Sequence, residues 1–119
     1  MARVMLVEDD QTMVSLLTTL LKIDGFEVIA MDPNEDIALA VARECPDALL
    51  MDVYLSTQNG LEILHRIRES DDPCKSRIIM ISGMNLAEEC MRSGADGFLL
   101  KPFSPDELVD LLNRTIKAG

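Results

Sequence analysis

Five short runs of apolar residues recur along the chain. They lie at positions 4–7, 27–31, 48–51, 77–82 and 98–100, and none of them alternates cleanly with polar residues. A strand with a continuous apolar run is buried on both faces, as in a parallel sheet that is covered by helices on both sides. The runs therefore predict five strands of such a sheet.

The segments between these runs carry apolar residues at helical spacing. Three stripes are clear: Met13, Leu16, Leu17, Leu20 and Leu21; Ile37, Ala38, Val41 and Ala42; and Leu61, Leu64 and Ile67, with Ile63 near the edge of the last. Gly25 is a natural stop for the first helix, and the second helix must end before Pro46.

The last two helices are predicted from their ends. Positions 85–88 begin a short fourth helix that Gly94 closes, while Ser104 and Glu107 form a capping box with Pro105 at the first helical position. A strand is thus followed by a helix five times over. With right-handed crossovers, this order predicts an α/β fold with a doubly wound parallel sheet.

Composition narrows the class of protein. The 119 residues fit a single domain that spans positions 1–119, and 48% hydrophobic residues are enough for a real core. The net charge of −10 and the lack of a Lys/Arg cluster argue against direct contact with nucleic acid. No apolar run approaches the roughly 18 residues of a membrane helix, so we expect no membrane association. Three cysteines without metal-ligand spacing are expected to be reduced thiols in a cytoplasmic protein.

Polar residues leave the predicted strands at their carboxyl ends, where ligands sit in sheets of this kind. The first strand is followed by Glu8, Asp9 and Asp10, the third by Asp52, the fourth by Ser82 and the fifth by Lys101. Two carboxylates about 4 Å apart repel by roughly 4 kcal/mol at an effective dielectric constant near 20, so a cluster of them needs a cation or a raised pKa on one of its members.

This set of groups suits phosphoryl chemistry. Hard oxygen ligands favour Mg²⁺, which binds through one or two carboxylates and keeps water for a phosphate. A metal-flanked aspartate is a plausible nucleophile for phosphorus, and Lys101 and Ser82 could contact the phosphoryl oxygens. The acidic residues after the first strand argue against a site that cradles a nucleotide phosphate there.

Four segments, in order, resemble the receiver domain of two-component response regulators across essentially the whole chain. "MLVEDD" resembles the acidic pair after the first strand, and "LLMDVYLSTQNGLEIL" the phosphoacceptor strand, with Gly60 eight residues after Asp52. "IIMISG" resembles the strand that ends in a switch residue, and "GADGFLLKPFSPDEL" the lysine-proline segment. The resemblance implies a flavodoxin-like receiver fold, with strand order 2-1-3-4-5 and five helices.

The resemblance also implies a role for each site residue. Asp52 would be the phosphoacceptor, while Ser82 and Lys101 would bind phosphoryl oxygens. The metal would be Mg²⁺, held by Asp52, by Asp9 directly, by Glu8 through water and by the backbone carbonyl of Tyr54. Ser82 and Phe98 would form the switch, and the bond between Lys101 and Pro102 would be cis, which costs little only before proline.

The partners implied by the resemblance follow from these roles. The phosphoryl donor would be the phosphohistidine of a sensor histidine kinase or of a histidine phosphotransfer protein. The output would pass to a downstream protein or to a covalently linked output domain, and a homodimer stays open. Such a domain is not a separate enzyme, because it promotes only its own phosphorylation and dephosphorylation.

Several positions depart from the family pattern. Ser56 stands where a proline is usual, which predicts a more mobile loop, and Phe98 lacks the hydroxyl of the frequent tyrosine. Tyr54 and Met84 each lie two residues beyond a site residue, where the family keeps the path of the hydrolytic water. We therefore predict that these two bulky groups prolong the life of the phosphoryl group.

Plainer interpretations stand beside these. Asp10 could simply cap the first helix, Phe98 could be ordinary core, and His65 is expected to be a surface residue. The whole chain could be a phosphorylation-independent interaction module with a vestigial site. An aspartate-based phosphatase is a further alternative, but it would want a second aspartate two residues after Asp52, where Tyr54 stands.

Overall fold

The computed structural model describes residues 1–70 and 74–117. Each predicted strand and helix is present, and the strand limits differ from the predicted ones by at most one residue. The elements are β1 (Arg3–Val7), α1 (Gln11–Ile23), β2 (Glu27–Met31), α2 (Ile37–Glu44), β3 (Ala48–Asp52), α3 (Gly60–Glu69), β4 (Arg77–Ser82), α4 (Ala87–Arg92), β5 (Gly97–Leu100) and α5 (Pro105–Lys117).

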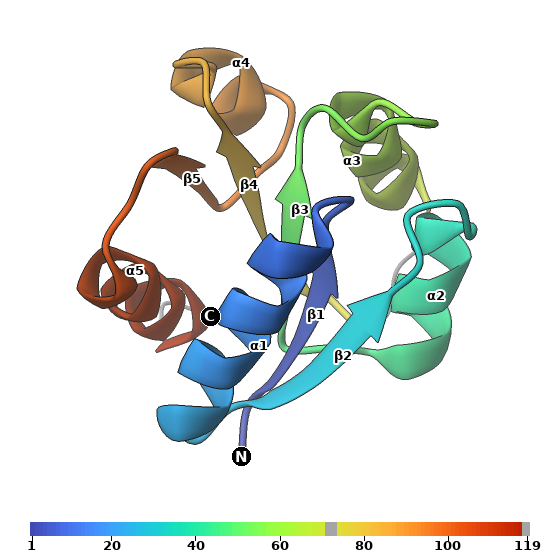
Figure 1. Ribbon diagram of the computed structural model, residues 1–119. Coiled ribbons are helices and arrows are strands. Elements are labelled where there is room, and N and C mark those ends of the chain that lie inside the picture. The colour runs from blue at the N-terminus through green and yellow to red at the C-terminus, as the bar shows by residue number, and fades with distance from the viewer. Residues whose placement is uncertain (71–73, 118–119) are drawn as a thin grey trace.

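The five strands form one parallel sheet in the order β2-β1-β3-β4-β5, as the resemblance implied. Helices α1 and α5 lie on one face, and α2, α3 and α4 lie on the other (Figure 1). The predicted fold class is confirmed. β3 is the central strand of the five, and all five of its residues are buried.

The continuous apolar runs arise because each strand feeds two cores. In β3, Leu49 and Met51 join the core under α2, α3 and α4, while Ala48 and Leu50 join the core under α1 and α5. All four side chains are fully buried. Neither face of the strand therefore tolerates a polar residue until Asp52, where the strand ends.

The helix ends follow from local chemistry. The Asp10 carboxylate accepts the backbone N–H groups of Thr12 and Met13, so Asp10 caps α1. Ser104 and Glu107 form the predicted capping box, with each side chain accepting the other residue's backbone N–H. One detail differs from the prediction. In α3, Ile63 is buried and Leu61 only partly so, because the core-facing stripe is rotated towards Ile63.

The start of α3 lies unusually close to the end of β3. A side chain at Gly60 would place its Cβ 2.3 Å from the backbone oxygen of Asp52 and 2.9 Å from the Cα of Val53. The N–H of Gly60 also donates to the Val53 carbonyl at 2.7 Å. The glycine is required because backbone, not a flexible side chain, occupies the space where its Cβ would be.

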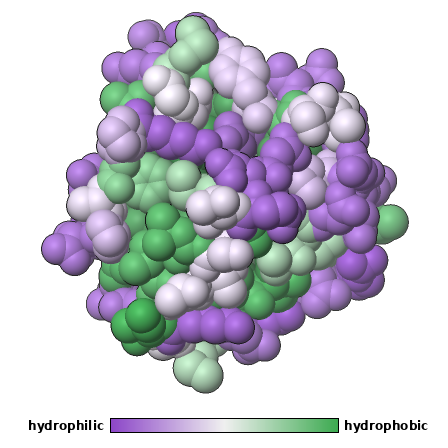
Figure 2. Space-filling view, in the orientation of Figure 1, coloured by the Kyte–Doolittle hydropathy of each residue, from purple (hydrophilic) through white to green (hydrophobic). Residues whose placement is uncertain are grey.

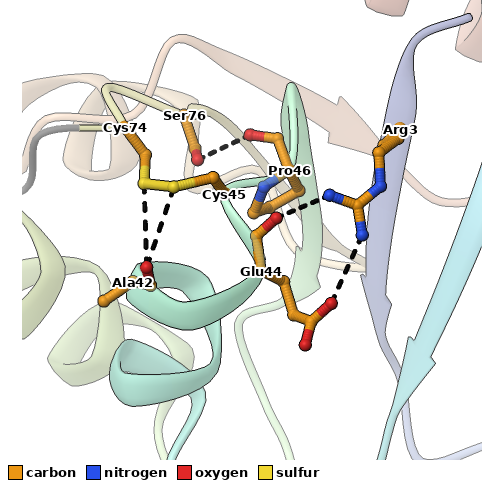
Figure 3. Close-up of a disulfide and its surroundings, with 7 residues drawn as sticks. All are labelled: Arg3, Ala42, Glu44, Cys45, Pro46, Cys74 and Ser76. Carbon is orange, nitrogen blue, oxygen red and sulfur yellow. Dashed lines mark hydrogen bonds and ion pairs between the residues drawn. A yellow bond between two sulfur atoms is a disulfide. The ribbon is translucent and has the colours of Figure 1, made fainter.

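The prediction of three reduced cysteines is wrong for two of them. Cys45 and Cys74 form a disulfide with their Cα atoms 5.2 Å apart, and only Cys90 has a free thiol (Figure 3). The two lie 29 residues apart in the sequence, so spacing alone gave no sign of their meeting. Among the described residues, no helix has the length and apolar character needed to cross a membrane.

Candidate functional site

The carboxyl ends of the strands bring the predicted site residues to one edge of the sheet. Asp52 is the last residue of β3 and Ser82 the last of β4. Glu8 follows β1, and Lys101 follows β5. Three of these side chains, those of Glu8, Asp52 and Lys101, are in direct contact and lie largely out of solvent.

Lys101 is the cation at the centre of this contact. Its Nζ lies 2.6 Å from Oδ2 of Asp52 and 3.6 Å from Oε1 of Glu8. Its backbone N–H donates to the Ser82 carbonyl at 2.8 Å, and its peptide bond to Pro102 is cis, as the resemblance implied. The backbone therefore positions the ammonium group beside β4 and aims it across at β3.

The charge balance of the site is uneven. Burial raises the pKa of Glu8 to about 7, and the hydrogen bond and negative charge of Asp52 act in the same direction, more strongly than Lys101 opposes them. Burial alone would lower the pKa of Lys101, but the hydrogen bond and charge of Asp52 outweigh it, and the net pKa is raised. One ammonium group thus pairs with two buried carboxyl groups. Of these two, the carboxyl group of Glu8 retains a proton near neutral pH.

The loop after β3 contacts the acidic residues. The second oxygen of Asp52, Oδ1, accepts the backbone N–H of Tyr54 at 3.0 Å. The Tyr54 side chain itself is 56% exposed. Asp9 accepts the backbone N–H of Ser56. The Asp10 side chain, in contrast, is engaged as the cap of α1.

Ser82 is almost completely buried at the adjacent strand end. Its Oγ accepts the backbone N–H of Met84 at 3.1 Å, while the Met84 side chain points outward and is 58% exposed. The hydroxyl is therefore held by the first residues of the β4–α4 loop, so a change in the bonding of Ser82 would be felt there.

Phe98 lies within β5, three residues before Lys101. It pairs in the sheet with Met80 and is half-buried against the core under α2, α3 and α4. These contacts are those of a core residue, and the ring is accommodated without a hydrogen bond. The switch role of Phe98 stays a prediction.

The donor set fits a hard divalent cation. Glu8 and Asp52 place carboxyl groups side by side, Asp9 follows directly in the chain, and together they exceed the charge that Lys101 can balance. Within residues 1–70 and 74–117, no three acidic, histidine or cysteine side chains come together as a ready-made metal cage. A site with two adjacent carboxyl groups and, among the described residues, no complete cage of side chains suits Mg²⁺, which takes one or two carboxylates and completes its shell with carbonyl oxygen and water.

A set of loop-to-loop contacts was not found from the sequence. The Gln58 amide donates to the carbonyls of Pro33 and Glu35 at 2.6 and 3.0 Å, and the Thr57 hydroxyl donates to Asn34 at 2.7 Å. These contacts fasten the β3–α3 loop to the β2–α2 loop. The partners lie 23 to 25 residues apart, so no local pattern in the sequence could indicate them.

An apolar groove of about 440 Å³ adjoins the site between α1 and the start of α5. Its walls are formed by Met13, Leu16, Leu17, Leu20, Pro102, Phe103 and Pro105, and Lys101 lies at its end. Figure 2 shows the corresponding apolar surface over α1 and towards α5. Leu16 is 52% exposed there, and Lys101 belongs both to the groove and to the charged site.

Comparison with known proteins points to one family. Residues 4–113 match the family model described as the response regulator receiver domain. The chemotaxis protein CheY of Bacillus subtilis is 30% identical over 96% of this chain and 97% of its own length. The transcriptional regulatory protein CpxR of Klebsiella pneumoniae is 36% identical over 92% of this chain, which spans about half of that relative, 47%.

A solved structure has the same fold. The receiver domain of a sensor histidine kinase from Pseudomonas aeruginosa, described with a magnesium ion coordinated in its active-site cleft, superposes with a TM-score of 0.84. The two chains are 26% identical, and the alignment covers 98% of each.

Proposed function

This chain belongs to the response regulator receiver domain family, a family of signalling domains, and from that membership and the site geometry we propose that it accepts a phosphoryl group on Asp52. The donor is the phosphohistidine of a sensor histidine kinase or of a histidine phosphotransfer protein. The readout is a changed protein-interaction surface, used by a separate downstream protein or by a linked output domain.

One observation carries the proposal: the 2.6 Å contact between the Lys101 ammonium and the Asp52 carboxylate at the end of the central strand. The Asp52 carboxylate is nearly buried, yet it lies at the carboxyl end of β3. The Lys101 ammonium beside it can move to the phosphoryl oxygens once Asp52 carries them. A structural ion pair would have no need of the second buried carboxyl group, Glu8, beside it. The excess of acid favours a site that gathers further positive charge.

The chain's own residues account for the transfer step. An Asp52 oxygen forms a bond to phosphorus while the bond from phosphorus to the donor imidazole nitrogen breaks, and that nitrogen keeps the electron pair. Once the Lys101 ammonium has moved away from the Asp52 carboxylate, it is placed to stabilise negative charge on the phosphoryl oxygens. The N–H of Tyr54 orients the acceptor carboxylate by holding Oδ1.

We propose Mg²⁺ as the cofactor, held by Asp52, Asp9 and the Tyr54 carbonyl, with Glu8 acting through water. When bound, the ion neutralises charge on the carboxylates and on the incoming phosphoryl group. The pair of buried carboxyl groups served by one lysine supports this choice, because a divalent cation would supply the missing charge.

The switch is proposed to begin at Ser82. A phosphoryl group on Asp52 offers new oxygen acceptors to the Ser82 hydroxyl, whose Oγ now accepts the N–H of Met84. Movement of Ser82 towards the phosphoryl group would pull on the β4–α4 loop, and Phe98 beneath α4 would repack. The phosphoryl group would thereby favour one of two arrangements of this surface.

The acceptor role is tested by mass spectrometry after incubation with acetyl phosphate and Mg²⁺. We expect one added phosphoryl group in the parent protein and none in Asp52→Asn. Lys101→Met should lower the labelled fraction severely while the fold is retained. A parent protein that gains no phosphoryl group would instead favour the phosphorylation-independent interaction module, and continuous release of phosphate would favour the phosphatase.

The apolar groove supports the choice of a protein as donor. Lys101 belongs to both groove and site, so a donor that reaches Asp52 from this side would cover the groove with an apolar surface. Leu16→Glu should slow transfer from a phosphorylated histidine phosphotransfer protein and leave labelling by acetyl phosphate unchanged. Leu39→Glu, on the exposed surface of α2, is the matched control and should affect neither reaction. Equal transfer to both variants would contradict docking at the groove.

A further inference from the structure

We propose that Cys45 and Cys74 form a reversible redox site, oxidised by exchange with a low-molecular-weight disulfide, that fastens the end of α2 to the segment leading into β4. The two residues flank the part of the chain that holds β3, Asp52 and α3. The site lies at the amino ends of β3 and β4, whereas the acceptor site lies at their carboxyl ends.

The pair is open to reagents in solution. Cys45 is the exposed C-cap of α2, and Cys74 is partly exposed. Both sulfur atoms lie over the last turn of α2, 3.7 and 3.8 Å from the carbonyl oxygen of Ala42 (Figure 3). An external thiol or disulfide can therefore approach the bond without unfolding the core, which is the condition for exchange.

The backbone on both sides of the bond is in an uncommon conformation. Among the described residues, Cys45 with φ of 47° and Lys75 with φ of 52° are the only non-glycine residues with positive φ. The left-handed region is unfavourable for residues with a Cβ and persists where the surroundings impose it. One such residue forms the disulfide and the other is next to it, so the bond joins two sharp corners of the backbone.

Noncovalent contacts beside the bond explain why reduction would be local and reversible. The Ser76 hydroxyl donates to the Pro46 carbonyl at 2.7 Å, and the backbone N–H of Arg77 donates to the Asp47 carbonyl at 3.1 Å. On the other side, Arg3 donates to the Glu44 carbonyl at 2.6 Å. The first two contacts keep the starts of β3 and β4 together when the thiols separate, and the third holds the end of α2 to β1, so the two sulfur atoms stay near enough to rejoin.

The oxidation balances with a disulfide as the oxidant. The more exposed Cys45, as its thiolate, attacks one sulfur of the external disulfide RSSR, forms a mixed disulfide and releases the first RS⁻. The thiolate of Cys74 then attacks the Cys45 sulfur and displaces the second RS⁻. In total, the two protein thiols lose two electrons and two protons, and RSSR becomes two RSH.

The remaining cysteine does not compete in this reaction. Cys90 is completely buried in α4, and burial raises the pKa of its thiol, so little of it is present as the reactive thiolate. Cys90→Ala therefore provides a protein whose reactive sulfur atoms are those of the proposed pair alone.

The first test counts thiols. Cys90→Ala is equilibrated in buffers of reduced and oxidised glutathione, alkylated and weighed by mass spectrometry. We expect the protein to change between two alkyl groups and none in a single two-electron step. Two alkyl groups in the most oxidising buffer, or accumulation of a glutathione adduct in place of the internal bond, would overturn the proposal.

The second test asks what the bond fastens. Amide hydrogen exchange of residues 37–44 should be slower in the oxidised than in the reduced protein, and the midpoint of thermal unfolding should fall by about 10 °C on reduction. Cys45→Ser should exchange like the reduced parent under both conditions. The reduced parent provides the same comparison without any substitution, so poor folding of the variant does not remove the test.

The acceptor site provides the internal control for the same inference. Labelling of Asp52 by acetyl phosphate should be equal in the oxidised and reduced proteins, because the disulfide lies at the opposite ends of β3 and β4. Equal hydrogen exchange of α2 in both redox states would show that the bond fastens nothing and would contradict the proposal. That result would leave the proposed phosphoryl acceptance untouched.

Discussion

The loops that follow β3 and β4 leave neighbouring strands that each end in a site residue, yet they are held very differently. In the β3–α3 loop, residues 53–59, Leu55 is buried and Gln58 and Thr57 bind the β2–α2 loop. In the β4–α4 loop, residues 83–86, the Asn85 side chain accepts the backbone N–H of Ala87, two residues further along the same segment, and Met84 is exposed.

The glycines of the two loops show the same contrast. Gly60 closes the β3–α3 loop where backbone atoms leave no room for a Cβ. A Cβ at Gly83, the first residue of the β4–α4 loop, would meet nothing within 4 Å. One loop is therefore packed against the end of its strand, and the other has space around it.

This difference separates two requirements of the proposed function. The acceptor carboxylate needs a fixed position before the phosphoryl group arrives, and the fastened loop supplies it through the N–H of Tyr54. The switch residue Ser82 needs a neighbour that can move with it. Contrary to the prediction of a more mobile loop, Ser56 adds to the fastening, because its backbone N–H bonds Asp9, and the proline usual at this position has no N–H to donate.

The largest expected effect comes from replacing each of the two glycines by alanine, one at a time. Gly60→Ala should cost about 3 kcal/mol of unfolding free energy, because backbone atoms of Asp52 and Val53 must move to admit the methyl group. Gly83→Ala should change it by less than about 0.5 kcal/mol, since the new methyl group enters open space. Urea unfolding of both variants measures the contrast. Equal losses would show that the two loops are equally constrained.

The next effect concerns the carboxyl groups beneath both loops. The pKa of Glu8 is raised to about 7 in the folded protein, so the folded state keeps a proton that the unfolded chain loses near pH 4.5. Stability from this group is therefore present at low pH and lost as the pH rises towards about 7. Relative to Glu8→Gln, the parent should lose about 2–3 kcal/mol between pH 5 and 8 in EDTA.

Urea unfolding at several pH values makes this measurement. The reference is Gln, which keeps the shape of the protonated acid and does not titrate. Added Mg²⁺ should reduce the loss, because a bound cation stabilises the ionised carboxylate. Parallel pH profiles for the two proteins would mean that Glu8 has the same pKa in the folded and unfolded states, and would contradict the raised pKa.

Much of this architecture follows from local patterns. Each strand is a continuous apolar run because its alternate residues enter two cores, and Asp10, Gly25 and Ser104 mark helix ends by chemistry that acts within a few residues. The contact between Asp52 and Lys101 was also predictable, because parallel strands end at one edge of the sheet. Strand order came from the resemblance, not from the pattern.

The missed features depend on residues that meet only after folding. The bond between Cys45 and Cys74 and the contacts of Gln58 join segments more than 20 residues apart, and neither pair has a distinctive spacing. The rotation of α3 about its own axis, which buries Ile63 in preference to Leu61, is set by how this helix packs on the sheet. The close approach at Gly60 was visible only as a family feature, and its physical reason lies in the backbone of β3.

A smaller effect is expected on the lifetime of the phosphoryl group, with one residue taken from each loop. Tyr54 and Met84 are both more than half exposed beside the site, so their bulk can hinder water without supporting the core. Tyr54→Asn combined with Met84→Glu should speed loss of the phosphoryl group about tenfold, equal to roughly 1.4 kcal/mol in activation free energy.

The single variants show which loop matters more. Tyr54 stands on the fastened loop and would shield the phosphoryl group from water continuously, whereas Met84 stands on the loop with space around it and would be free to swing away, so Tyr54→Asn should account for most of the change. The measurement is the decay of labelled protein after acetyl phosphate is removed. A double variant that decays no faster than the parent would rule out shielding by these side chains.

The smallest effect tests the fastening itself. Gln58→Ala removes two hydrogen bonds to carbonyls of the β2–α2 loop, at 2.6 and 3.0 Å, and should cost about 1–1.5 kcal/mol. Asn85→Ala removes only a 3.4 Å contact within the β4–α4 loop and should cost a few tenths of a kcal/mol. Hydrogen exchange of residues 53–59 should quicken in Gln58→Ala alone. If hydrogen exchange of residues 53–59 is unchanged in Gln58→Ala, the β3–α3 loop owes its order to Gly60 and Leu55, and its contacts with the β2–α2 loop contribute nothing to the placement of Asp52.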